Sequence, residues 1–242
     1  MSADVLPRTI AIIPARGGSK RIPRKNIKPF CGVPLLARTV GLLQSTGLFA
    51  RIVVSTDDKE ISDVACGAGA EVPFVRPAEL ANDQIGDVPV IRNAVEWLTR
   101  HGETADLFMC VYPAAVLVTP ATFRTAVKCA ASGCYDFVLA VAAFPHPAQR
   151  ALRKLPAGGC EMVQPEHRMT RSQDLEPLYF DAGQFKIANR HVWLEGRHVF
   201  SPASLMIELA HTEVQDIDTP ADWDRAERLF TASSVTDTHA RR

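Results

Sequence analysis

The chain has 242 residues, of which 47% are hydrophobic and 22% charged, and its 27 basic and 27 acidic side chains balance to a formal net charge of zero. This balance argues against a nucleic-acid-binding protein, which usually carries a basic surplus that neutralises phosphates. No apolar run approaches the roughly 20 residues of a membrane span, and the six cysteines form no CxxC pair, so we expect a cytoplasmic protein with free thiols that does not bind a membrane.

Short apolar runs alternate with helical patterns through the first 141 residues. Four apolar runs are typical of strands that are covered on both faces: 10–13, 52–55, 108–112 and 137–141. Four helical patterns accompany them: 35–44, 59–67, 88–100 and 121–131. In the third pattern, apolar residues recur every three or four positions, which marks one buried face. The alternation predicts an α/β fold in which a mainly parallel sheet lies between two layers of helices.

The alternation stops after residue 141. The segment 144–182 contains several prolines and no sustained helical period, and we interpret it as an arm inserted into a single domain over 1–232. Beyond the arm, the sequence predicts a strand at 184–188 and a final helix at 219–230. The polar residues 233–242 are predicted to form a flexible tail.

A basic loop that contains two glycines leaves the first predicted strand. Ligands of parallel α/β sheets bind beyond the carboxyl ends of the strands, so this loop is well placed for a phosphate. Gly17 and Gly18 would let backbone N–H groups approach an anion. Six cationic side chains lie in the same loop: Arg16, Lys20, Arg21, Arg24, Lys25 and Lys28. The loop matches neither GxxxxGK[ST] nor GxGxxG, and the alternative to a triphosphate site is a solvated basic loop.

Two carboxylates lie two positions apart near the C-terminal end, in the segment Asp216-Ile-Asp218-Thr-Pro220. In an extended segment, residues i and i+2 face the same side, so both acids could reach one ion. Mg²⁺ takes one or two protein carboxylates together with substrate phosphates. The alternative is that Asp218 or Thr219 caps the final helix, since Asp222 follows three positions after Thr219. Asp57-Asp58 likewise precedes a predicted helix and is expected to cap it.

Together, ARGGSKRIPRKN at 15–26, STDD at 55–58, VPFVRPAELAND at 72–83 and DIDT at 216–219 resemble the CMP-sugar-acid synthetases, the acylneuraminate cytidylyltransferase family. PHPAQRAL at 145–152, RSQDL at 171–175 and DAGQF at 181–185 are most similar to the pseudaminic acid cytidylyltransferases within it. The resemblance covers about residues 8 to 230. It implies a three-layer Rossmann-like nucleotide-diphospho-sugar transferase fold, CTP and Mg²⁺ as co-substrate and cofactor, and a homodimer in which the arm reaches towards the partner.

The resemblance also implies roles for individual residues. It assigns CTP contacts to Arg16, Gly17, Gly18, Ser19, Lys20, Lys25, Asn26, Arg76, Asp83 and Asp87. It assigns catalysis to Arg16, Lys20, Lys25, Asp216 and Asp218, with the two aspartates as metal ligands. Contacts to the sugar acid fall on Tyr112, Gln149, Arg171 and Gln184. For Arg171, the alternative is an ion pair with Asp174 or Glu176 on a surface loop.

The chain departs from the family pattern in three places: the segment 112–118, Phe180 and Lys186-Ile187. These places are expected to form pocket walls, so acceptor specificity is predicted to depend on them and on the arm. The expected reaction is an in-line attack of a nonulosonic acid hydroxyl on the α-phosphorus of CTP, which releases pyrophosphate. The alternatives are an enzyme for sialic, legionaminic or octulosonic acid, and a homologue that binds the nucleotide without turnover.

Overall fold

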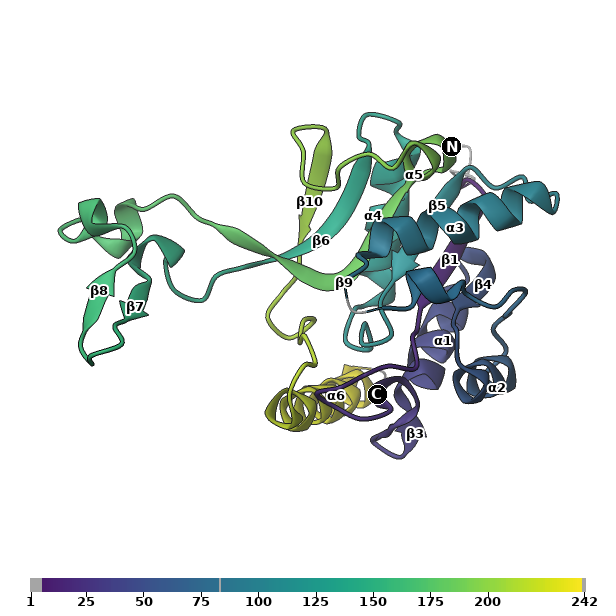
Figure 1. The fold of residues 1–242 in the computed structure, drawn as a ribbon, viewed down its shortest axis with the longest axis horizontal. Helices are drawn as coiled ribbons and strands as arrows, with labels where there is room; N and C mark the ends of the chain where they lie inside the picture. Colours follow the sequence, from purple (N-terminus) through teal and green to yellow (C-terminus); the bar gives the residue numbers. More distant parts are fainter. Residues whose placement is uncertain (1–5, 83, 241–242) are drawn as a thin grey trace.

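The computed structural model describes residues 6–82 and 84–240. A six-stranded sheet in the order β10-β6-β9-β5-β1-β4 forms the centre of the molecule (Figure 1). Its strands are β1 (Thr9–Pro14), β4 (Phe49–Ser55), β5 (Leu107–Val111), β6 (Phe137–Ala143), β9 (Tyr179–Asn189) and β10 (Ser204–Glu208). β1 pairs in parallel with β4 and β5, and β10 pairs in parallel with β6. β9 lies antiparallel between β5 and β6, so the sheet is mostly parallel.

Helices cover both faces of this sheet. Alternate residues of β1 supply two separate cores, because successive side chains of a strand point to opposite faces. Ala11 and Ile13 pack with α1 (Leu35–Thr46), α2 (Lys59–Gly67) and α4 (Pro120–Ala131). Ile10 and Ile12 pack with α3 (Asp87–Arg100) and α5 (Arg190–Glu195). The predicted three-layer α/β fold is confirmed.

A third core joins the C-terminal helix to the start of the chain. Trp223 of α6 (Pro220–Ala240) packs edge-on against Phe30, which is fully buried, with ring centroids 5.5 Å apart. Phe30 belongs to a short hairpin formed by β2 (Pro29–Phe30) and β3 (Val33–Pro34). This packing places the segment that precedes α6 beside the basic loop, which β1 and β2 flank in the sequence.

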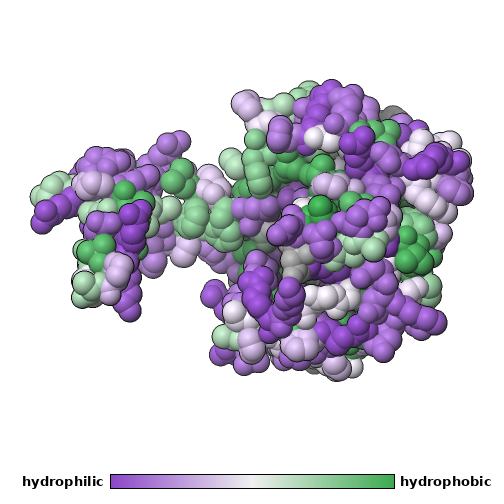
Figure 2. All heavy atoms as spheres, viewed as in Figure 1, coloured by the Kyte–Doolittle hydropathy of each residue, from purple (hydrophilic) through white to green (hydrophobic). Residues whose placement is uncertain are grey.

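The segment between β6 and β9 forms an arm that projects from the body (Figure 1). Its only strands among the described residues are β7 (Leu152–Lys154) and β8 (Cys160–Met162), which pair as a hairpin. Apolar side chains lie on its surface, including Met169, which is 88% exposed, and Leu152, which is 62% exposed (Figure 2). Five 3-10 turns complete the described structure: Lys25–Ile27, Ala78–Leu80, Ala148–Arg150, Pro165–His167 and Ser172–Asp174.

The predicted strands and helices of residues 1–141 lie within a few residues of the observed ones. α5, β10 and the β2–β3 hairpin were not predicted, and β9 begins five residues before the predicted strand, which starts at Gln184. The last helix continues to Ala240, beyond the predicted end at Phe230 and through most of the segment predicted as a tail. Within the part of the chain that the structure describes, no helix combines the length and apolar character needed to cross a bilayer.

Candidate active site

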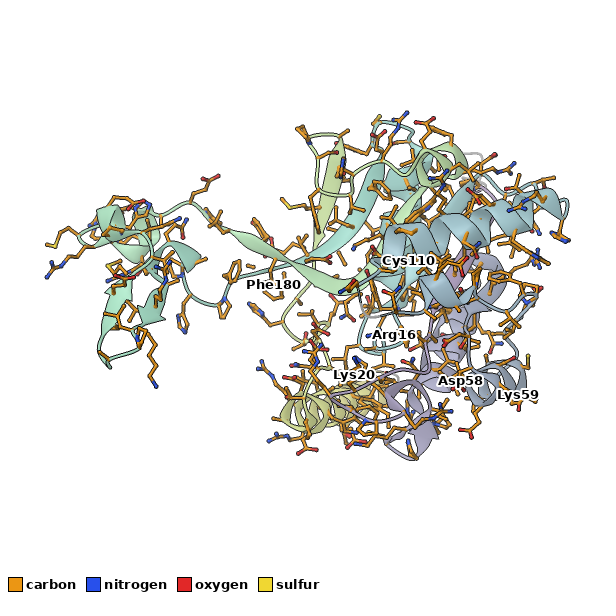
Figure 3. The ribbon with its side chains drawn as sticks, viewed as in Figure 1. Arg16, Lys20, Asp58, Lys59, Cys110 and Phe180 are labelled. Carbon is orange, nitrogen blue, oxygen red and sulfur yellow. The ribbon has the colours of Figure 1, made fainter. Side chains whose placement is uncertain are left out.

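A cleft of about 260 Å³ opens at the carboxyl ends of β1 and β5. Most of the residues predicted to bind a nucleotide line it: Arg16, Ser19, Lys20, Lys25, Asn26, Arg76 and Asp87. Tyr112 and Asp218 line it as well. Arg16 and Lys20 lie between the sheet and α6 (Figure 3). The cleft is therefore basic where the loop enters it and has one predicted metal ligand in its wall.

The two glycines of the loop have different surroundings. Gly17 donates its backbone N–H to Oδ1 of Asp57 at 3.1 Å, so this N–H group is not turned towards the cleft. A Cβ on Gly17 would lie 2.6 Å from Oδ2 of Asp58, whereas a Cβ on Gly18 would meet open space. Neither glycine lines the cleft. Gly17 is therefore packed closely on the start of α2 with its N–H bonded to Asp57, and the contact of the two glycines with CTP stays a prediction.

Asp58 is the N-cap of α2, as the sequence predicts. Its carboxylate accepts the backbone N–H of Ile61 at 3.0 Å. The same carboxylate binds Arg24 of the loop at 2.5 Å, and this hydrogen bond holds the pKa of Asp58 below its ordinary value. Arg24 has a left-handed backbone conformation with φ of 54°. The loop is thus anchored at its C-terminal end by a capping residue.

The loop is also bonded to the acidic segment before α6. Lys25 donates from Nζ to the backbone carbonyl of Ile217 at 2.7 Å, and its Nζ lies 3.7 Å from Oδ1 of Asp218. Arg21 pairs with the same Oδ1 at 2.7 Å. Asn26 is buried and donates to the carbonyl of Arg16 at 3.0 Å, which fixes the shape of the loop from within. Two segments almost 200 residues apart in the sequence therefore form one wall of the cleft.

Asp216 and Asp218 flank the fully buried Ile217, and both acids are at least partly accessible to solvent. Thr219, and not Asp218, caps α6: its hydroxyl accepts the N–H of Asp222 at 3.2 Å, and the Asp222 carboxylate accepts the N–H of Thr219 at 2.8 Å. Partial burial and the neighbouring charge of Asp218 both raise the pKa of Asp216. Asp218 is therefore not used as a helix cap, and its carboxylate faces Arg21 and Lys25 of the basic loop.

The donor chemistry of this pair suits Mg²⁺. No described residue donates a hydrogen bond to the carboxylate of Asp216, and such a carboxylate next to a second one favours a shared cation. Only Asp218 of the two lines the cleft. The described residues hold no group of three or more His, Cys, Asp or Glu side chains that could bind a metal ion. A cation here would therefore take its remaining ligands from a phosphate and from water.

A buried guanidinium lies in the cleft near the end of β4. Arg76 is 4% exposed and donates from Nε to the hydroxyl of Ser55 at 3.1 Å and from Nη2 to the Ser55 carbonyl. Burial lowers its pKa to about 10, and the described residues include no carboxylate that forms an ion pair with it. Asp83, which was assigned to the same end of the site, lies outside the described residues. Arg76 therefore holds a positive charge in the wall of the cleft, and its contact with CTP stays a prediction.

Asp87 and Tyr112 line the cleft and are joined to Lys186, which the sequence analysis expected in a pocket wall and which lies behind these two residues. The Tyr112 hydroxyl donates to Oδ2 of Asp87, and Lys186 Nζ donates to the same oxygen at 2.7 Å. Burial opposes ionisation of Asp87, but the Lys186 ammonium outweighs it and holds the pKa of Asp87 below its ordinary value. Burial also raises the pKa of Tyr112. The sequence feature that points to this buried network is a single lysine within the otherwise apolar run 185–188.

Three residues predicted to contact the sugar acid do not reach this cleft. Arg171 pairs with Asp174 at 2.8 Å on the arm, which is the alternative considered from the sequence. Gln149 is buried within the arm and donates to the carbonyl of Glu176 at 2.8 Å. Gln184 is buried in β9 and donates to the carbonyl of Ala182 at 2.8 Å. None of the three lines the cleft of its own chain, and their contact with the sugar acid stays a prediction.

A second cavity, which we call the side pocket, lies between β6, β9 and β10. Its volume is about 300 Å³, and its lining is mainly apolar: Leu139, Val141, Tyr179, Phe180, Asp181, Val199, Phe200, Ser201, Ser204 and Met206. Phe180 lies where the arm leaves the body (Figure 3). Asp181 is its one charged residue.

Comparison with known proteins bears on both the fold and the cleft. Residues 10–121, which include the basic loop, match the family described as cytidylyltransferase. The pseudaminic acid cytidylyltransferase of Campylobacter jejuni is 38% identical over 223 residues, which cover 92% of this chain and 96% of that relative. This chain belongs to the cytidylyltransferase family. The CMP-N,N'-diacetyllegionaminic acid synthase of Legionella pneumophila is 32% identical to this cytidylyltransferase and covers 92% of it.

A solved structure shares the fold of this cytidylyltransferase. A CMP:2-keto-3-deoxy-manno-octonic acid synthetase, solved in complex with CTP, is similar with a TM-score of 0.68. The likeness covers 93% of this chain and 99% of that one, at 16% sequence identity. At this identity the comparison concerns the fold, and it agrees with the predicted Rossmann-like nucleotidyltransferase architecture.

Proposed function

We propose that this cytidylyltransferase transfers CMP from CTP to the anomeric hydroxyl of a nonulosonic acid, pseudaminic acid or a close relative, and releases pyrophosphate. The relatives named above act on acids of this type, and the similarity extends over nearly the whole chain. The cleft has the charges that the reaction requires, with cationic side chains from the loop on one wall and the Asp216–Asp218 pair beside them.

One observation carries the proposal: the basic loop and the acidic segment are bonded to each other at the cleft. Lys25 reaches the Ile217 carbonyl at 2.7 Å, and Arg21 reaches Asp218 at 2.7 Å. The contact gathers cationic side chains and a carboxylate pair at one wall of the cleft. A triphosphate needs both, because its oxygens bind cationic side chains directly and bind carboxylates through a cation.

The side chains of the cleft would act by position and charge. Arg16, Lys20 and Lys25 would hold the triphosphate and stabilise the departing pyrophosphate. Arg76 would fix the end of the nucleotide that lies near β4. Asp216 and Asp218 would hold Mg²⁺, which supplies charge neutralisation at the α-phosphate when it is bound. The geometry thus favours an in-line displacement without a covalent enzyme intermediate.

The direct test is pyrophosphate release from CTP and Mg²⁺ with purified acids supplied one at a time. We expect release with pseudaminic acid or a close relative, and weaker release with legionaminic, sialic and octulosonic acids. Preference for one of those three would change the acceptor but keep the reaction. If CTP binds and no acid gives pyrophosphate, the chain is a non-catalytic nucleotide-binding homologue and the proposal is wrong.

We also propose that the protein works as a homodimer. The arm exposes Leu152 and Met169, and it holds Gln149 and Arg171 away from the cleft of its own chain. Packing of the arm on a second copy would cover the apolar side chains and could bring the polar ones to the partner's site. We place this assembly in the cytoplasm, where CTP is made and the six free thiols stay reduced.

A further inference from the structure

Lys186 is a charged side chain in the middle of the central sheet. It is 5% exposed and pairs with Cys110 of β5 and Leu139 of β6, whose side chains belong to the core beneath α3 and α5. Burying an ammonium group is costly unless carboxylates and hydrogen bonds compensate it. We propose that Lys186 is a positioning residue that links the nucleotide cleft to the side pocket. The inference rests on the proposed function and assigns Lys186 a physical role in it, the coupling of acceptor recognition to the nucleotide cleft.

On the cleft side, Lys186 forms hydrogen bonds with two residues that line the cleft. Its Nζ donates to Oδ2 of Asp87 at 2.7 Å and to the Tyr112 hydroxyl at 3.1 Å. Asp87 is the first residue of α3, where the helix dipole also favours a negative charge. Tyr112 follows β5 directly. Lys186 therefore fixes the start of a helix and the end of a strand relative to each other at the wall of the cleft.

On the other side, Lys186 contacts residues in the wall of the side pocket. Its Nζ lies 3.1 Å from Oδ2 of Asp181 and 5.6 Å from the ring centroid of Phe200. Both of these residues line the side pocket, and Phe200 is 71% exposed. One ammonium group thus touches the walls of two cavities. Asp181 is the more accessible carboxylate, with a side chain that is 29% exposed against 17% for Asp87.

The contact between Lys186 and Asp181 depends on an irregularity in β9. Residues five positions apart in a regular strand face opposite sides and lie about 16 Å apart. Here Leu139 pairs with Lys186 while Val141 pairs with Asp181, so the register shifts between them, and Gly183 has a φ of +60°. Such bulges redirect side chains and are frequent beside active sites. The fold has therefore brought Asp181 to the ammonium group.

The charges of the network make it responsive to a ligand. One ammonium group serves two carboxylates, so the network carries a net negative charge that extends to Asp181 in the side pocket. An acceptor sugar with hydroxyl and amide N–H groups could donate to Asp181. Lys186 would then be drawn more fully to Asp87, and the cleft wall would tighten around the nucleotide. Binding in the two cavities would in this way be coupled.

Steady-state kinetics and CTP titration calorimetry of four variants test the proposal. We expect Asp181→Asn to raise KM for the acceptor about tenfold, the loss of one charge-assisted bond, and to strengthen CTP binding slightly, because Lys186 is then left to Asp87 alone. Lys186→Met should weaken the binding of both CTP and the acceptor and should lower kcat. Lys186→Arg should restore part of the CTP affinity. Lys59→Met, which removes an exposed lysine paired with Asp63, should match the wild type.

These measurements distinguish failure of the Lys186 proposal from failure of the proposed function. The proposal is overturned if Asp181→Asn leaves KM for the acceptor unchanged, or if Lys186→Met lowers only the thermal midpoint. If Lys186→Met fails to fold, the acceptor KM of Asp181→Asn still tests the proposal, because this variant keeps the Lys186–Asp87 pair. If the wild type releases no pyrophosphate, the proposed function fails instead, and CTP affinity of Lys186→Met against Lys186→Arg still tests the cleft side of the network.

Discussion

At the scale of single residues, Asp218 and Asp222 have different roles although they are four positions apart. Asp218 faces the cleft and pairs with Arg21, whereas Asp222 accepts two hydrogen bonds from Thr219 at 2.8 Å and completes the cap of α6. Asp218→Ala should reduce turnover at least about a hundredfold, because transition-state charge loses its compensation, and should change the unfolding free energy by less than about 1 kcal/mol. Pyrophosphate release measures the effect on turnover, and urea unfolding measures the effect on the unfolding free energy.

Asp222→Ala is the matched control for Asp218→Ala. It should lower the unfolding free energy by about 1 kcal/mol, the usual effect of losing a helix cap, and leave turnover near that of the wild type. Equal effects of the two substitutions on turnover would remove Asp218 from the reaction and assign the whole segment a structural role.

At the scale of elements, a buried ion cluster ties β1, β4 and the turn after α3 at the opposite end of the sheet. Glu103 has a side chain that is 4% exposed, binds Arg8 and Arg51 at 2.9 Å each, and accepts two backbone N–H groups. Hydrogen bonding from Arg8 is the largest of the effects that lower its pKa to about 2. The carboxylate is more acidic in the folded chain than in the unfolded one, whose pKa is about 4.3.

The sign of the pH effect follows from this difference. Glu103 contributes stability above about pH 4.3, and the contribution disappears as the pH falls towards 2. Glu103→Gln should therefore lower the unfolding free energy by about 1–3 kcal/mol at pH 7, and by progressively less between pH 4.5 and 3. Glu71→Gln, which removes a half-exposed partner of Arg51, should have a smaller effect. A Glu103→Gln deficit that does not change with pH would contradict the assignment.

The same elements show what the sequence can predict. Strands such as β5 are apolar throughout because helices cover both of their faces. A continuous apolar run in the sequence therefore predicts such a strand. β10 lies at the sheet edge with Met206 54% exposed, and the six residues of α5 are too short for a helical period, so neither has a clear pattern. The basic loop and the acidic pair are local clusters of charge and were predicted. Lys186 meets Asp87 and Asp181 only through the sheet pairing and the β9 bulge, which no local pattern reveals.

At the scale of the whole molecule, the arm raises the question of where it acts. It leaves the body as an extended projection (Figure 1), and its Arg171 does not line the nucleotide cleft of its own chain. An apolar surface of this kind in a monomer would be exposed to water without compensation, whereas a twofold dimer would cover both arms at once. If each arm completes the other chain's site, Asp218 and Arg171 of one active site belong to different chains.

Complementation between two inactive variants tests this arrangement. In a mixed dimer of Asp218→Ala and Arg171→Ala chains, one site has both substitutions and the other has neither. Coexpressed chains that associate at random should then recover about a quarter of the wild-type activity, because half of the dimers are mixed and each has one intact site. Sedimentation of the wild type should give a dimer, which Met169→Glu should weaken. A monomer, or mixed dimers without recovered activity, would mean that Arg171 serves only its ion pair with Asp174 and that the arm contributes nothing to a neighbouring site.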